Sequence, residues 1–170
     1  MNSHSIIDPY ELIIISPNDK AKMIMSECLQ VEPNTELIQM LINLGANINW
    51  VNDFSLTPLH FATVNNKPEI VRMLIEAGSD IHAKESHGLV ALHFAVWHSP
   101  EIVKMLLEYG EDVDVQDDAG YTPLHWTAYF SKADIATILI EAGANQQIKN
   151  ILGYTWSEFW KLHDKKVFNQ

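Results

Sequence analysis

Four glycines recur at a nearly constant spacing, and this repeat constrains the fold more than any other feature of the chain. Gly45, Gly78, Gly110 and Gly143 are 33, 32 and 33 residues apart. Each ends a similar phrase, such as EIVRMLIEAG or EIVKMLLEYG. A second phrase keeps step with the first, as TPLHFA, VALHFA and TPLHWT. Self-similarity at this period indicates an array of stacked units rather than a single globular core.

The sequence of each repeat predicts two short helices joined by a turn. Thr57 can cap the first helix, and Pro58 can take its first position, where a missing N–H has no cost. Ser99 and Ser131 are the expected caps of two second helices, because an acidic residue follows each in the first turn. The recurring glycine can adopt the left-handed conformation that ends a helix. The apolar stripe of the second helix comprises Ile70, Val71, Leu74 and Ile75, and recurs as Ile102, Val103, Leu106 and Leu107.

The period and the T-P-L-H-x-A wording resemble the ankyrin repeat, over roughly residues 17–160. The resemblance implies an all-α solenoid of helix-turn-helix repeats joined by projecting β-hairpin loops. We expect an ankyrin-repeat domain at 17–170 after an N-terminal extension or cap at 1–16. That extension either packs over the first helix or forms an arm. The expected repeats are 17–51, 52–84, 85–116 and 117–149, with a C-terminal capping repeat at 150–170.

The composition narrows the classes of function. The chain has 22 Asp and Glu against 11 Lys and Arg, a formal net charge of -11 and one arginine, Arg72. This balance argues against binding nucleic acid or an anionic membrane. The apolar run at residues 12–15 is too short to span a bilayer. We expect a monomeric cytoplasmic protein, or one delivered to a host cytosol if it is an effector.

No signature of catalysis or of a cofactor stands in the sequence. It has no phosphate loop, no G-x-S-x-G elbow and no H-E-x-x-H. The single cysteine, Cys28, lies in an apolar stretch and is expected to be a buried small hydrophobe rather than a nucleophile. These observations predict a protein that is not an enzyme.

Three histidines recur in phase, His60, His93 and His125. Metal ligands must converge on one point, whereas equivalent positions in a solenoid are spaced along its axis. The resemblance implies instead that each histidine bonds the backbone of the neighbouring hairpin. We therefore expect no metal site.

Acidic residues cluster between Lys104 and Lys132, a stretch without lysine or arginine. Two interpretations stay open, a solvated loop with Asp117 at the family's hairpin-bonding position, or an electrostatic contact with a basic partner. The cluster comprises Glu108, Glu111, Asp112, Asp114, Asp117 and Asp118.

Several positions do not repeat, and the resemblance places them along a concave groove. They carry Trp, Tyr, Phe and Leu beside aspartate, which is the composition of a protein interface. Alternatively, Trp97 or Phe130 folds down between helices and fills a gap. The predicted protein-binding residues are Asp53, Phe54, Leu56, Val64, Asn65, His87, Leu89, Trp97, His98, Asp118, Tyr121, Tyr129, Phe130, Leu152 and Tyr154.

The expected function is binding of another protein through this groove, centred on repeats two to four. The chain would act as a regulator, an adaptor or a host-directed effector, on a partner with a basic or mixed apolar and basic surface. A module that binds a small ligand or a lipid head group is the alternative, which the acidic groove disfavours.

Overall fold

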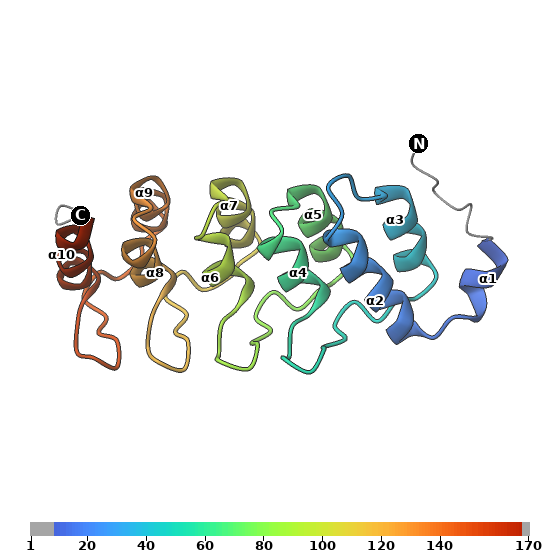
Figure 1. The fold of residues 1–170 in the computed structure, drawn as a ribbon, viewed down its shortest axis with the longest axis horizontal. Helices are drawn as coiled ribbons and strands as arrows, with labels where there is room; N and C mark the ends of the chain where they lie inside the picture. Colours follow the sequence, from blue (N-terminus) through green and yellow to red (C-terminus); the bar gives the residue numbers. More distant parts are fainter. Residues whose placement is uncertain (1–8, 168–170) are drawn as a thin grey trace.

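The computed structural model describes residues 9–167, with side chains from Leu12 to Leu162. The first eight residues of the predicted N-terminal extension and the last three of the predicted capping repeat lie outside the described residues. The described chain is an elongated array with α1 at one end and α10 at the other (Figure 1). This all-helical solenoid confirms the predicted fold class.

The helices form two parallel rows (Figure 1). The helices of the inner row pack against one another in order along the array, and so do those of the outer row. The inner row is α2 (Pro17–Cys28), α4 (Pro58–Val64), α6 (Ala91–Ala95), α8 (Pro123–Tyr129) and α10 (Trp156–Val167). The outer row is α3 (Thr35–Asn43), α5 (Pro68–Glu76), α7 (Pro100–Glu108) and α9 (Ala133–Glu141), and α1 (Pro9–Ile14) precedes both rows.

The predicted start of the inner helices is confirmed. The Thr57 side chain accepts a hydrogen bond from the backbone N–H of His60, whose Nδ1 in turn accepts one from the N–H of Thr57. Thr122 and His125 repeat this arrangement in α8. Both threonines therefore cap their helix reciprocally with the histidine of the same phrase.

One predicted cap is wrong. Ser99 caps α7 by accepting from the N–H of Ile102, but Ser131 does not cap α9. Ser131 instead adopts a left-handed backbone conformation, with φ of 56°, as Asn66 does two repeats earlier with φ of 51°. Both residues belong to a turn that is one residue longer than the turn of the third repeat. With this longer turn Lys132 takes the N-cap position and α9 begins at Ala133.

The core is a continuous apolar layer between the two rows. Leu59, Leu92 and Leu124 of the inner helices are buried, as are the stripes of α5 and α7 except for the half-buried Leu107. Cys28 is buried in the same layer, as predicted, and burial raises the pKa of its thiol to about 12. At one end Leu12 of α1 joins this core, whereas Ile13 and Ile14 are exposed.

The hairpin loops project from one side of the array (Figure 1). Within residues 9–167 they contain no regular strand, and one isolated antiparallel bridge joins Lys149 and Thr155. One side chain at the start of each loop accepts two backbone N–H groups, from residues two and four positions further on. Those side chains are Asn52, Glu85, Asp117 and Asn150.

Neighbouring loops are tied by backbone hydrogen bonds. Ser86 donates to the carbonyl of Phe54, Asp118 to that of His87, and Ile151 to that of Ala119, at 2.9 to 3.1 Å. Gly88 makes this approach possible, because it has φ of +79° and a Cβ there would collide with Asp118. The loops therefore lie side by side in a fixed register.

Candidate protein-binding surface

Five aromatic side chains from the third and fourth repeats form one connected group, here called the aromatic row. Trp97 stacks on Phe130 with ring centroids 5.9 Å apart and planes 18° apart. Phe130 stacks on Trp126 at 5.7 Å and meets Tyr129 edge-on at 5.0 Å. Trp126 also contacts Tyr121 at 5.9 Å. The row thus runs from the turn after α6, across α8, to the loop before α8.

Exposure differs along the row. Trp97 is 51% exposed and Tyr129 is 53% exposed, although both are large and partly apolar. Phe130, Trp126 and Tyr121 are half-buried, and the first two pack against the core. The alternative in which Trp97 folds down between helices is therefore wrong. For Phe130 that alternative is partly right, since the half-buried ring packs against the core and also stacks on Trp97.

Trp126 was missing from the sequence-based set. Its position carries Phe61 and Phe94 in the preceding repeats, so it looked like scaffold. The signal was present in the helical spacing, because residues three and four positions further on share its face, and these are Tyr129 and Phe130. Its Nε1 donates to Asp117 Oδ2 at 3.1 Å, which fixes the indole beside the third loop.

The other predicted residues lie on the hairpin loops and at the ends of inner helices. Val64 and Asn65 are half-buried at the end of α4, and His98 is half-buried after Trp97. Burial lowers the pKa of His98, and the nearby Lys132 lowers it further. On the loops, Leu56 and Leu89 are half-buried, and the exposed residues are Asp53, Phe54, His87, Asp118, Leu152 and Tyr154.

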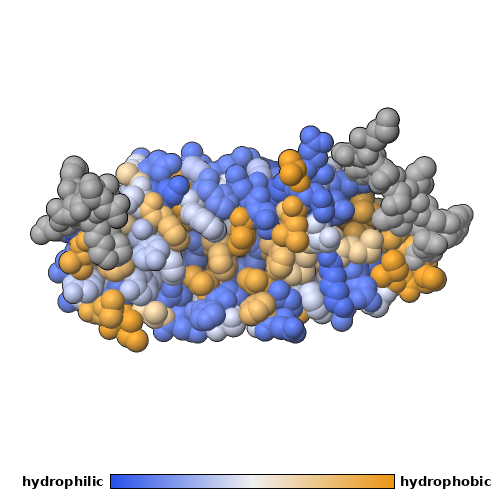
Figure 2. Space-filling model, viewed as in Figure 1, coloured by the Kyte–Doolittle hydropathy of each residue, from blue (hydrophilic) through white to orange (hydrophobic). Residues whose placement is uncertain are grey.

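The structure joins some of these residues and separates others. Ring contacts connect Trp97, Tyr129 and Phe130 directly, and connect Tyr121 through Trp126. The other loop residues lie on neighbouring loops that backbone hydrogen bonds hold in register. Figure 2 shows a further apolar cluster at its lower left, over the last loop. On that loop Ile151 is 74% exposed and Leu152 is also exposed.

Most of the clustered acids hold the local backbone. Asp117 Oδ1 accepts from the N–H groups of Ala119 and Tyr121, which is the role that the resemblance implied. Glu111, Asp112 and Asp114 also accept backbone N–H groups. Of the six, in the described part of the chain, Glu108 and Asp118 alone accept none.

A family model for ankyrin repeats, in three copies, matches residues 23–117 and 101–150. The two segments overlap and together cover more than half of the chain. The chain belongs to the ankyrin repeat family. No curated protein sequence matches it. Ankyrin repeats generally act as protein–protein interaction modules, and the family is typically non-enzymatic.

In this ankyrin array two of the recurring histidines bond the next loop. His93 Nε2 lies 3.2 Å from the carbonyl oxygen of Tyr121, and His125 Nε2 lies 3.1 Å from that of Tyr154. This confirms the hairpin contact that the resemblance implied for these two. Burial lowers the pKa of His93 to about 4 and also lowers that of His125. Both rings are therefore neutral near pH 7 and act as structural links.

Among the described side chains, no three histidine, cysteine, aspartate or glutamate residues gather as metal ligands would. Within residues 9–167, no helix combines the length and the apolar content needed to cross a bilayer.

Proposed function

We propose that this ankyrin array binds another protein through the aromatic row and the loop positions beside it, without catalysing a reaction. The observation that carries the proposal is the pair of half-exposed rings, Trp97 and Tyr129, on a connected aromatic group. Exposed tryptophan and tyrosine of this kind dominate binding energy at protein interfaces. Because the rings are already stacked, little side-chain freedom is lost when a partner covers them.

Charge supports a partner with a basic or mixed apolar and basic surface. The chain has a net charge of -11, and Asp118 lies on the loop that also carries Tyr121. Complementary charge of this kind mainly raises the rate of association and selects the partner. The chain would act as a regulator, an adaptor or a host-directed effector according to which partner protein carries the basic or mixed apolar and basic surface.

The test is a pull-down from cell lysate with wild type beside the double variant Trp97→Ala/Tyr129→Ala. We expect partners that wild type retains and the variant loses, because truncating two hot-spot rings costs roughly 4 kcal/mol in all. The matched control is Tyr109→Ala, which removes an exposed aromatic side chain after α7, away from the aromatic row. Partners retained equally by all three proteins would contradict the proposed surface.

A further inference from the structure

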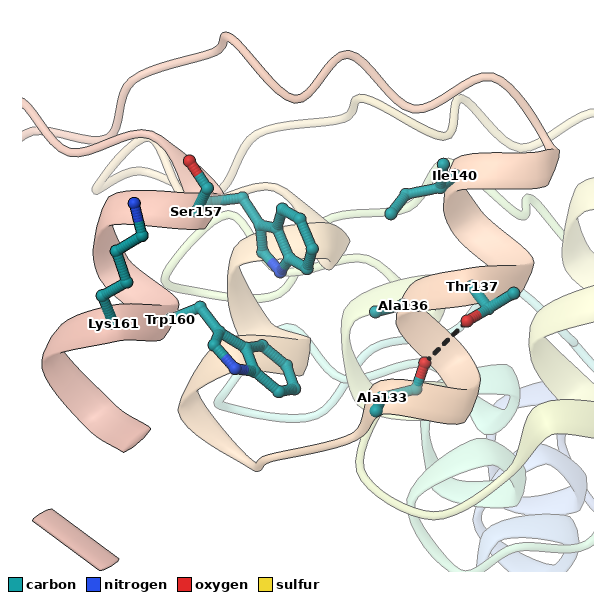
Figure 3. A pocket seen from close by; sticks show the side chains of 8 residues that line it. Ala133, Ala136, Thr137, Ile140, Ser157, Trp160 and Lys161 are labelled. Carbon is teal, nitrogen blue, oxygen red and sulfur yellow. Dashed lines mark hydrogen bonds between the residues drawn. The ribbon is translucent and has the colours of Figure 1, made fainter. Parts of the chain in front are cut away.

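An open apolar hollow lies between α9 and α10, at the end of the array opposite α1 (Figures 1 and 3). Its volume is about 360 Å³. Trp160 points from α10 toward α9 at the level of Ala133, and Ile140 lies further along α9, nearer the level of Ser157 (Figure 3). The lining residues are Ala133, Ala136, Thr137, Ile140, Trp156, Ser157, Trp160 and Lys161.

In the earlier repeats the same place is filled by a helix. α7 packs on α6, the inner helix of its own repeat, and on α5, the preceding outer helix. α9 packs on α8 and α7 in the same way. α10 continues the inner row by packing on α8, but within residues 9–167 no outer helix follows it. The hollow therefore lies where the next outer helix would pack if the array continued by one more repeat.

The residues on α9 fit this interpretation. Ala136 and Ile140 stand 33 positions after Val103 and Leu107, which belong to the apolar stripe of α7. In α7 that stripe faces a core closed by the next outer helix, α9. Beside the hollow Ile140 is half-buried, as Leu107 is at the equivalent place in α7, and Thr137 is exposed, as Lys104 is. An aliphatic partner would bury these surfaces further.

The residues on α10 define the shape of the occupant. Trp160 takes the position of Ala62, Ala95 and Thr127, so a large ring stands where the other inner helices carry a small buried residue. Trp156 Nε1 donates to Thr127 Oγ1 at 3.1 Å, and the two indoles lie 5.8 Å apart. The hydrogen bond and the ring contact therefore hold the two indoles in place before any helix binds. Because Trp160 replaces a small residue, the hollow is shallower than the sites where α7 and α9 pack.

We propose that this hollow binds an amphipathic α-helix of a partner protein, in the place of a fifth outer helix. The helix would carry branched aliphatic residues along one face, as α9 does with Ile135 and Leu139, which are buried. Opposite Trp160 it would carry a small residue, because the indole occupies that depth. Lys161 lines one side of the hollow, so an acidic residue on the same edge of the helix would be favoured. This site is separate from the aromatic row.

The probe is a synthetic peptide of residues 132–143, held helical by a covalent bridge between positions 137 and 141, since a free 12-residue peptide would be mostly unfolded. It is added to the full chain, and the indole N–H signals are followed by NMR. We expect the signals of Trp156 and Trp160 to shift with saturation, while that of Trp97 stays in place. A scrambled peptide with the same bridge should shift none of them.

Two variants locate the binding. Ile140→Asp should weaken the peptide at least tenfold, and Thr137→Phe, at an exposed position, should do the same by filling the hollow. Ile151→Asp places the same charge on the exposed last loop and should change nothing. The proposal would be overturned if millimolar peptide shifted no indole signal. It would also be overturned if Ile140→Asp and Thr137→Phe both bound the peptide as tightly as wild type. Self-association that Thr137→Phe abolishes, measured by sedimentation, would overturn the choice of occupant in favour of a second copy.

Discussion

Trp97 and Phe130 touch each other but should respond differently to truncation. Trp97 is half exposed, so Trp97→Ala should lower the free energy of unfolding by less than about 1 kcal/mol and weaken partner binding by about 2 kcal/mol. Phe130 packs against the core, so Phe130→Ala should cost about 2 to 3 kcal/mol of stability as well. Urea denaturation and a binding titration on the same variants measure both quantities. Equal stability losses would mean that the two rings are equally buried.

His93 should make the array sensitive to acid. Its pKa is about 4 in the folded state because burial disfavours the charged ring, against 6.5 for an ordinary histidine. A depressed folded-state pKa gives stability that is present above pH 6.5 and is lost as the pH falls toward 4. The loss should approach about 3 kcal/mol. His93→Gln should flatten this part of the profile of unfolding free energy against pH, and an unchanged slope would contradict the assignment.

Glu111 and His82 should act in the opposite direction. Glu111 is buried where other repeats have Ala46, Ser79 or Ala144, and its Oε1 lies 2.9 Å from His82 Nδ1. Burial raises the pKa of Glu111, and the hydrogen bond to Glu111 raises that of His82. Both folded-state pKa values lie above the ordinary ones, so the stability they give is present at low pH and lost as pH rises.

Glu111→Ala should therefore gain stability relative to wild type as the pH is raised from 4.5 to 8, because the variant lacks both shifts. Denaturation midpoints at the two pH values measure the difference. Ser79→Ala, at the equivalent position without a titrating partner, is the control and should show no such trend. A constant difference between Glu111→Ala and wild type would show that the pair does not titrate in this window.

At the scale of elements, α6 begins without the threonine cap and the first-turn proline that α4 and α8 share. Val90 offers no side-chain acceptor, yet its φ of -98° and ψ of 171° are close to the -86° and 167° of Thr57. This extended conformation also suits a residue that precedes proline. Val90→Thr with Ala91→Pro should therefore stabilise the array by about 1 kcal/mol.

The denaturation midpoint in urea checks this prediction. The reverse change, Thr122→Val with Pro123→Ala in α8, is the matched variant and should destabilise the array by a similar amount. A loss of stability from the change in α6 would show that Ala91 lacks room for a proline ring.

Elements could be predicted from this sequence wherever a contact recurs in every repeat. The threonine caps of α4 and α8 and the stripes of the outer helices follow from in-phase positions, whereas the hairpin role of Asp117 was implied by the family resemblance. Ser131 was mispredicted because a serine before an acid suits a cap and a left-handed turn equally well, and only the turn length decides between them. Trp126 was missed because one residue serves both the scaffold and the surface. Whether a particular ring is exposed depends on packing between repeats, which spacing alone does not encode.

At the scale of the whole molecule, the recurring histidines belong to different repeats, and each bonds locally. His93 and His125 each link an inner helix to the loop that follows it. The melting temperature should therefore be unchanged by EDTA and by added zinc, as scanning calorimetry would show. A fall of several degrees with EDTA, reversed by zinc, would contradict this.

The stack of Trp97 on Phe130 joins the third repeat to the fourth. In a solenoid each repeat is held only by its neighbours, so the two halves can part at any single junction. A protein bound across both rings would hold the third and fourth repeats together. The array would then resist stretching most strongly at the junction between these two repeats. Pulled from its two ends, the bound array should come apart first on either side of this junction, whereas the free array has no such protected joint.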